Sequence, residues 1–212
     1  DCDFDKMLST TIRSSFANQG QICLCGSRIF IERPIYEKFK TAFVEKVSRM
    51  KVGNPADDTT KMGAIVSQSH MEKVLSYVDL AKDEGGTVLT GGNQALVDGE
   101  CAEGWFIHPT IIEGLSFDCR TNQEEIFGPV VTIMPFDTEE EVLMMANSTK
   151  YGLASTVWTQ NLKKAHRMAR NLHAGIVWIN CWLLRDLRTP FGGAKQSGVG
   201  REGGFEALEF FT

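Results

Sequence analysis

Apolar side chains recur every three or four positions along two stretches of the chain, which is the spacing of one helix face. The first stretch follows Pro34 and stops at the Gly-Asn-Pro sequence at 53–55. Its apolar positions are Ile35, Phe39, Ala42, Phe43 and Val47. The second stretch begins after Ser67 or Ser69 and ends at the glycine pair at 85–86. Its apolar positions are Met71, Val74, Leu75, Val78 and Ala81. We expect an amphipathic helix in each stretch.

Strands and further helices are predicted between and after these two helices. Strand-like runs occupy residues 87–89, 106–112, 130–136, 155–159 and 175–180. Helical patterns occupy residues 161–173 and the stretch from 138 to 147, which opens with the capping-box spacing of Thr138 and Glu141. Strands that alternate with helices indicate βαβ crossovers. The sequence therefore predicts an α/β fold with three layers, in which a mainly parallel sheet carries helices on both faces.

Composition narrows the class of protein. The chain has 212 residues, of which 42% are hydrophobic and 23% charged, and its formal net charge is -5. This length suits one substantial core, and no apolar run approaches the roughly 20 residues that cross a bilayer. Lys and Arg are mixed with Asp and Glu, so no basic stripe exists to neutralise phosphates. We expect no nucleic acid partner and no membrane partner.

The six cysteines and four histidines give no pattern for a metal site or a disulfide framework. The N-terminal residues have neither the basic nor the apolar region of a signal peptide, which favours reduced thiols in the cytoplasm. No second Cys or His pair stands at ligand spacing, so no metal is predicted. The histidines are scattered, and we expect solvated or core positions for each.

Three motifs follow one another along the chain. The first spans residues 15–25, where a helical pattern ends in a glycine-containing corner that presents Cys23 two residues after Gln21. The second is Glu-Glu-Ile-Phe-Gly-Pro at 124–129, and the third is Pro-Phe-Gly-Gly at 190–193 followed by Lys-Gln-Ser-Gly at 195–198. Together they resemble the catalytic half of an NAD(P)-dependent aldehyde dehydrogenase. The resemblance covers nearly the whole chain.

This resemblance implies one thiol-bearing catalytic domain over residues 1–212. In the family, a nucleotide-binding domain, an Asn that helps bind the oxyanion and a Glu-Leu-Gly-Gly general base precede the thiol, and none of them lies in this sequence. We therefore expect a catalytic domain without its nucleotide-binding domain, inactive by itself. The implied cofactor is NAD, with NADP not excluded. The implied partners are a small aldehyde substrate and, in the full protein, further copies of the same chain in a homo-oligomer.

Cys23 is the residue that the resemblance implies as nucleophile. A thiolate is far more nucleophilic at neutral pH than a hydroxyl, and the thioester that it leaves is reactive enough for water to hydrolyse. The backbone N–H of Cys23 is also a candidate donor to the oxyanion. From the residues alone, Cys23 and Cys25 could equally be buried apolar thiols, which is the usual state of free cysteine.

Glu125 and Phe127 are the residues that the resemblance implies for cofactor binding. In the family, the second Glu of the motif accepts hydrogen bonds from the nicotinamide ribose hydroxyls, and the Phe packs near the ring. A carboxylate suits a vicinal diol because its two oxygens accept both hydroxyl protons. From spacing alone, these residues would be an acid at a helix N-terminus beside a core aromatic.

Arg185 is the residue implied for substrate binding. It lies in a loop, Trp-Leu-Leu-Arg-Asp-Leu-Arg at 182–188, that resembles the branch of the family that oxidises 2-aminomuconate or 2-hydroxymuconate semialdehyde. There the first Arg of the loop holds the substrate carboxylate, and a planar guanidinium can do so with two parallel hydrogen bonds. The plain alternative is a surface arginine paired with solvent or with Asp186.

The sequence leaves three hypotheses about function open. The first is NAD-dependent oxidation of a muconate-type semialdehyde to the acid through a Cys23 thiohemiacetal and thioester. The second is an aldehyde dehydrogenase of broader or different specificity. The third belongs to another class, and regards the chain as an isolated fold unit without catalysis.

Overall fold

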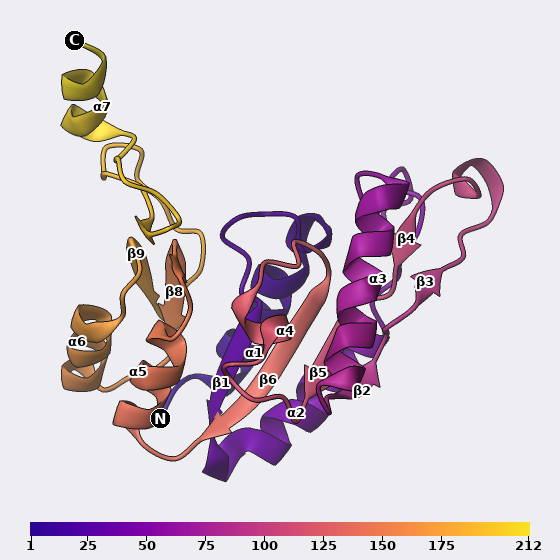
Figure 1. Ribbon diagram of the computed structural model, residues 1–212, viewed down its shortest axis with the longest axis horizontal. Helices are drawn as coiled ribbons and strands as arrows, with labels where there is room; N and C mark the ends of the chain where they lie inside the picture. The colour runs from indigo at the N-terminus through magenta and orange to yellow at the C-terminus, as the bar shows by residue number, and fades with distance from the viewer. The chain divides into compact units, whose positions relative to one another are not determined.

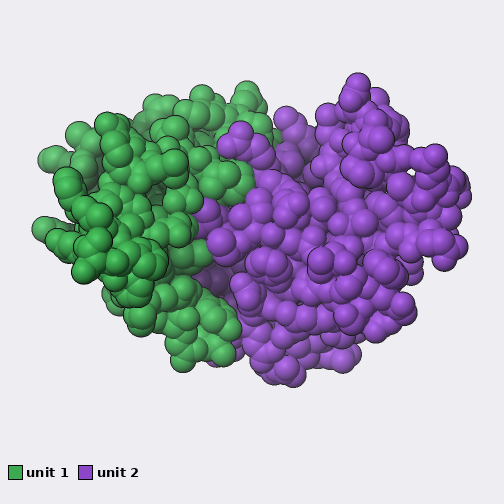
Figure 2. All heavy atoms as spheres, turned by 90° about the horizontal axis from the view of Figure 1, so that it is seen from above, with its two compact units in different colours: residues 1–10, 138–212 green, residues 11–137 purple.

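The computed structural model describes residues 1–212 (Figure 1). Contacts within the chain divide it into two compact units (Figure 2). Unit 2 comprises Thr11–Asp137, and unit 1 comprises Asp1–Thr10 with Thr138–Thr212. The boundary at residue 10 falls inside the first helix, α1 (Phe4–Phe16). That residues 1–212 form one functional domain stays a prediction.

Unit 2 is built on a four-stranded sheet in the order β1-β6-β5-β2. Its strands are β1 (Arg28–Glu32), β6 (Val130–Phe136), β5 (Thr110–Glu113) and β2 (Thr87–Thr90). The pairs β1 with β6 and β5 with β6 are parallel, whereas β2 pairs with β5 in the antiparallel sense. The sheet is thus mainly parallel, as the alternation of strands and helices predicts.

Helices cover both faces of this sheet. Adjacent strand residues point to opposite faces. On β5, Ile112 packs in the same apolar cluster as the buried side chains of α3 (Gln68–Asp83). Its neighbour Glu113 turns to α2 (Arg33–Ser48), where it accepts a hydrogen bond of 2.9 Å from the Tyr36 hydroxyl. Helices α2 and α3 therefore lie on opposite faces, and the predicted three layers are confirmed.

The predicted helices begin where their capping residues indicate. Ser67 caps α3, because its side chain accepts a hydrogen bond from the His70 backbone N–H. Thr138 caps α5 (Glu139–Asn147) by the same geometry, through the Glu141 N–H. In contrast, α2 ends at Ser48, five residues before Gly53, where the sequence predicts its end.

The predicted strand at 106–112 is wrong, because the structure divides it in two. Residues Phe106–Ile107 form β4, which pairs with β3 (Gln94–Ala95) in a separate antiparallel ribbon. Pro109 lies between β4 and β5. A proline has no backbone N–H to continue a ladder, so the chain leaves one sheet there and enters the other.

Unit 1 contains a second βαβ arrangement. Strand β8 (Ala154–Val157) is followed by α6 (Leu162–Asn171) and then by β9 (Ile176–Ile179), which pairs with β8 in parallel. The remaining elements are β7 (Tyr151–Gly152), β10 (Ala194–Lys195), α7 (Gly204–Phe211), α4 (Arg120–Gln123) and the short helices η1 (Ala17–Gly20) and η2 (Gly99–Cys101). None of the helices combines the length and the apolar character needed to cross a membrane.

Candidate active site

Cys23 lies in an exposed turn of unit 2 that follows α1. Three consecutive residues before it have left-handed backbone angles: Asn18 with φ of 49°, Gln19 with 58° and Gly20 with 70°. The Cys25 N–H then bonds to the Ile22 carbonyl at 2.9 Å, which closes a tight turn around Cys23. The Cys23 N–H has no hydrogen-bond partner in the chain, so it is free to donate to a substrate oxygen.

The left-handed turn is fixed by hydrogen bonds to a distant segment, residues 63–66. Left-handed angles are costly for residues other than glycine, so such a turn needs compensation from its surroundings. The Gln19 side chain donates to the Ala64 carbonyl at 3.0 Å and accepts from the Gly63 N–H at 3.4 Å. The Gln21 side chain accepts from the Val66 N–H at 3.2 Å. Both glutamines of the motif therefore serve to shape the turn.

The two cysteines of the turn differ in exposure. Cys23 is exposed, Leu24 is buried beneath the turn, and Cys25 is half-buried. The Cys25 thiol donates weakly to the Ala17 carbonyl at 3.7 Å. Burial raises the pKa of the Cys25 thiol, and this outweighs the hydrogen bond with the Ile22 backbone, which acts in the opposite direction. Of the two thiols, Cys23 is the more accessible to a reagent in solution.

The motif at 124–129 lies against this turn. Gly20 approaches the Gly128 carbonyl so closely that a Cβ atom on Gly20 would lie within 3.0 Å of the oxygen. Glu125 is exposed, and its carboxylate has no hydrogen bond or ion pair with another group of the chain, so both oxygens are available to a diol. Phe127 is half-buried and has a left-handed φ of 60°. The structure thus brings the thiol turn and the predicted cofactor motif together.

Arg185 lies in unit 1 on the loop between β9 and β10. Its guanidinium pairs with the Glu202 carboxylate at 3.3 Å and stacks on the Phe191 ring at 4.0 Å from the centroid. If Arg185 were an ordinary surface arginine, Asp186 would be its expected partner. Asp186 instead pairs with Arg188. The Arg185 side chain retains 32% exposure, so its planar group is partly open to a ligand.

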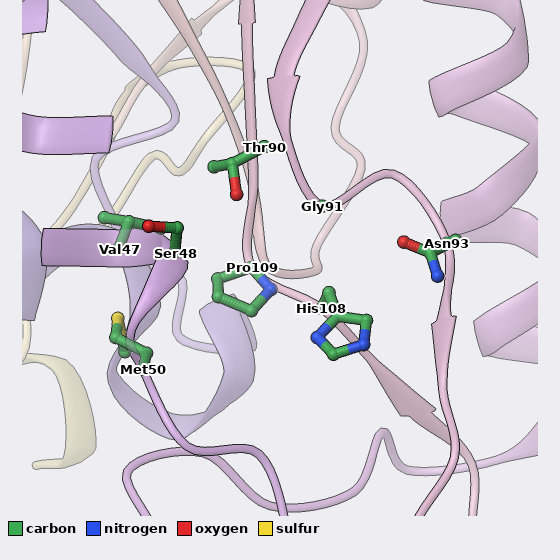
Figure 3. A pocket seen from close by; sticks show the side chains of 8 residues that line it. All are labelled: Val47, Ser48, Met50, Thr90, Gly91, Asn93, His108 and Pro109. Atoms are coloured by element: carbon green, nitrogen blue, oxygen red, sulfur yellow. The ribbon is translucent and has the colours of Figure 1, made fainter. Parts of the chain in front are cut away.

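Unit 2 contains a pocket of about 210 Å³ (Figure 3), and no residue of the thiol turn lines it. It lies where the end of α2 approaches the segments that follow β2 and β4. Its polar lining comes from Ser48, Thr90, Asn93 and His108. None of Cys23, Glu125 and Phe127 lines it, so this pocket is not part of the candidate active site.

His70 contacts the candidate site although its sequence context does not predict it. Its Nε2 atom lies 2.7 Å from the Phe127 carbonyl oxygen, and its ring meets the Phe127 ring edge-on with centroids 6.3 Å apart. Lys73, one helical turn later, donates to the Glu125 carbonyl at 3.0 Å. Spacing along α3 could have shown that both residues share a face, but no signal in the sequence connects that face to residues 125–127.

Comparison with known proteins identifies the family. The family model described as "Aldehyde dehydrogenase family" matches residues 1–212. This chain belongs to the aldehyde dehydrogenase family. Among curated relatives, the chain is 50% identical over 212 residues to "2-aminomuconic 6-semialdehyde dehydrogenase" of Pseudomonas sp., covering 100% of the chain and 43% of the relative.

One further sequence relative and one solved structure belong to the same family. "2-hydroxymuconic semialdehyde dehydrogenase" of Pseudomonas sp. (strain CF600) is 50% identical over 212 residues, which cover 100% of the chain and 44% of that protein. The solved NAD+ complex of an aldehyde dehydrogenase from Bacillus cereus is 43% identical, with a TM-score of 0.93 over 99% of this chain and 42% of that one. The chain therefore spans less than half of the length of the aldehyde dehydrogenases that it matches.

Proposed function

We propose that the full-length protein oxidises an aldehyde to a carboxylic acid with NAD, and that Cys23 is the nucleophile. The observation that carries this proposal is the packing of Gly20 on Gly128, because it sets an exposed thiol beside the motif that would hold the cofactor. Membership of the aldehyde dehydrogenase family supports the same reaction.

The chemistry begins with attack of the Cys23 thiolate on the carbonyl carbon of the aldehyde. A C–S bond forms, the carbonyl oxygen takes the negative charge, and the free N–H of Cys23 can donate to that oxygen. NAD, when bound, supplies the acceptor for the hydride that leaves this carbon as the C=O bond forms again. The product on the enzyme is a thioester of Cys23. Water then adds to the thioester carbon and loses a proton to solvent, and the thiolate leaves with release of the acid.

Glu125 and Phe127 are the residues that would bind the nicotinamide end of the cofactor. The Glu125 carboxylate is unpaired within the chain and exposed, which fits a role in accepting hydrogen bonds from two ribose hydroxyls. The Phe127 ring is held edge-on to His70 and half-exposed, which fits a flat apolar contact. NADP would meet the same residues.

We propose a muconate-type semialdehyde as substrate, with its carboxylate held by Arg185. The two relatives that oxidise such semialdehydes by name support this choice. A broader aldehyde specificity is the competing proposal, and the pairing of Arg185 with Glu202 favours it, because a substrate carboxylate would have to displace Glu202. We further propose that the protein acts in the cytoplasm as a homo-oligomer.

The test is NADH production by the full-length protein with 2-hydroxymuconate semialdehyde and with an uncharged aldehyde of similar length. We expect oxidation of the semialdehyde, and a loss of at least a thousandfold in kcat for Cys23→Ser, since a hydroxyl is a much weaker nucleophile than a thiolate. Cys25→Ser is the matched control and is expected to keep most of the activity. Retention of the wild-type rate by Cys23→Ser would contradict the assignment of the nucleophile.

A further inference from the structure

One face of α3 runs along the predicted cofactor motif. His70, Lys73 and Tyr77 are separated by three and four positions, so they share that face. They bond in turn to the Phe127 carbonyl at 2.7 Å, the Glu125 carbonyl at 3.0 Å and the Glu124 carboxylate at 2.7 Å. The helix therefore holds this motif by three successive contacts. The motif runs antiparallel to α3, because residues later in the helix contact residues earlier in the motif.

The segment that leads into α3 holds the thiol turn. Residues 63–66 bind the side chains of Gln19 and Gln21, and α3 starts at once after the Ser67 cap. A continuous stretch from residue 63 to residue 70 thus contacts the thiol turn at one end and Phe127 at the other. It is the element that connects the two halves of the candidate site.

Phe127 needs support at this place. Its left-handed φ of 60° is unfavourable for an aromatic residue. Such a conformation is kept only where several surrounding contacts hold the backbone in place. The Phe127 carbonyl accepts a hydrogen bond from the His70 Nε2–H, because a carbonyl oxygen can only accept. On the following residue, a Cβ atom at Gly128 would collide with the Val74 side chain of the same helix. The backbone at 127–128 is therefore confined between α3 and Gly20.

We propose that His70 is a positioning residue for the cofactor site. By binding the Phe127 carbonyl it keeps the left-handed bend that presents Glu125 and the Phe127 ring on the side of the thiol turn. The proposal rests on the proposed roles of Glu125 and Phe127 in binding NAD. His70 itself touches neither the reacting atoms nor, in this account, the cofactor.

The experiment compares His70→Gln with His70→Leu in the full-length protein. Both side chains fill space similar to that of histidine, but only glutamine keeps an N–H donor the same number of bonds from the backbone as Nε2. We expect His70→Leu to raise the KM for NAD by about 3- to 10-fold, the effect of losing one hydrogen bond, and His70→Gln to stay within about 2-fold of the wild type. The KM for the aldehyde should change little in either variant.

Two controls separate positioning from a general loss of structure. Gln68→Ala alters an exposed residue of the same helix, whose side chain bonds only to Glu72, and it should leave the KM for NAD unchanged. The alkylation rate of Cys23 by iodoacetamide should be the same in His70→Leu and the wild type, because the glutamine contacts of the thiol turn remain.

The possible failures are distinguishable. If the wild-type protein makes no NADH from any aldehyde, the proposed function is wrong. If the wild type is active and the Leu and Gln variants give the same KM for NAD, whether raised or normal, the role of His70 as a donor is overturned and the proposed function stands.

Discussion

Gly20 packs directly on the Gly128 carbonyl, with no room for a side chain between them. This relationship joins the turn that bears Cys23 to the motif that bears Glu125. It also combines two separate demands for glycine at position 20, since the residue has a φ of 70° as well as the close approach.

Replacement of Gly20 by alanine should therefore cost more than a left-handed angle alone. The angle costs on the order of 1–2 kcal/mol for a residue with a Cβ atom, and the forced movement of the Gly128 backbone adds roughly 1–3 kcal/mol. Urea unfolding of Gly20→Ala measures the sum. The matched control is Gly99→Ala, where φ is 72° and no atom lies within 4 Å of the added Cβ. Equal losses in the two variants would show that the contact with Gly128 is unimportant.

Alkylation should distinguish the two thiols of the turn. The thiolate is the reactive form, and Cys25 combines partial burial with a pKa that burial raises. We expect iodoacetamide at pH near 7.5 to modify Cys23 at least several-fold faster than Cys25, as read by peptide mass spectrometry over time. Cys25→Ser should keep the fast phase and Cys23→Ser should lose it. Faster modification of Cys25 would mean that the turn opens in solution.

Arg185→Ala should weaken the binding of a carboxylated semialdehyde. Charge-assisted hydrogen bonds contribute about 1.5–3 kcal/mol each, so the KM should rise by roughly 10- to 100-fold while the KM for an uncharged aldehyde stays close to normal. Arg188→Ala is the matched control, because Arg188 lies on the same loop and pairs with Asp186. A parallel loss for charged and uncharged aldehydes would remove Arg185 from substrate recognition.

Stability in acid should depend on Glu84. Burial disfavours the charge of this carboxylate, but hydrogen bonds from Thr121 and Arg120 at the start of α4 outweigh it and lower its pKa below the ordinary 4.5. A carboxylate with a lowered pKa in the folded state stabilises the fold above its ordinary pKa, and this contribution is lost as pH falls through the lowered value. We expect Glu84→Gln to have a lower Tm than the wild type at neutral pH, with the difference shrinking below pH 4.5.

Thermal unfolding across that range measures this effect. Glu100→Gln, at an exposed position in η2, should follow the wild type at every pH. A Tm difference for Glu84→Gln that is constant from neutral pH to acid would assign the effect to shape rather than to charge.

The features that the sequence predicts well are those set by neighbouring residues. Ser67 and Thr138 cap their helices because the group that each one binds lies three positions away. The apolar spacing of α3 likewise matches its buried face. The single strand predicted at 106–112 fails at Pro109, and this break has a local cause that the sequence itself contains.

The features that escape sequence reasoning depend on distant partners. Strand β1 is only five residues long, and its pairing with β6 joins Arg28 to Thr132. The left-handed angles at Asn18 and Gln19 exist because residues 63–66 bind the turn. His70 joins the site through one carbonyl 57 positions later. No spacing rule connects such positions, so only the folded chain reveals them.

The thiol turn is shaped by residues that lie far downstream in the sequence. Gln19 and Gln21 bind groups 44 and 45 positions downstream, and Gly128 follows more than a hundred positions after Gly20. Contacts between such remote positions form slowly, because long loops must close first. During synthesis or refolding, Cys23 thus stays on an unstructured corner until the remote pieces have docked. Its surroundings therefore form late in folding, and an incompletely folded molecule exposes this thiol without the glutamine contacts that shape the turn.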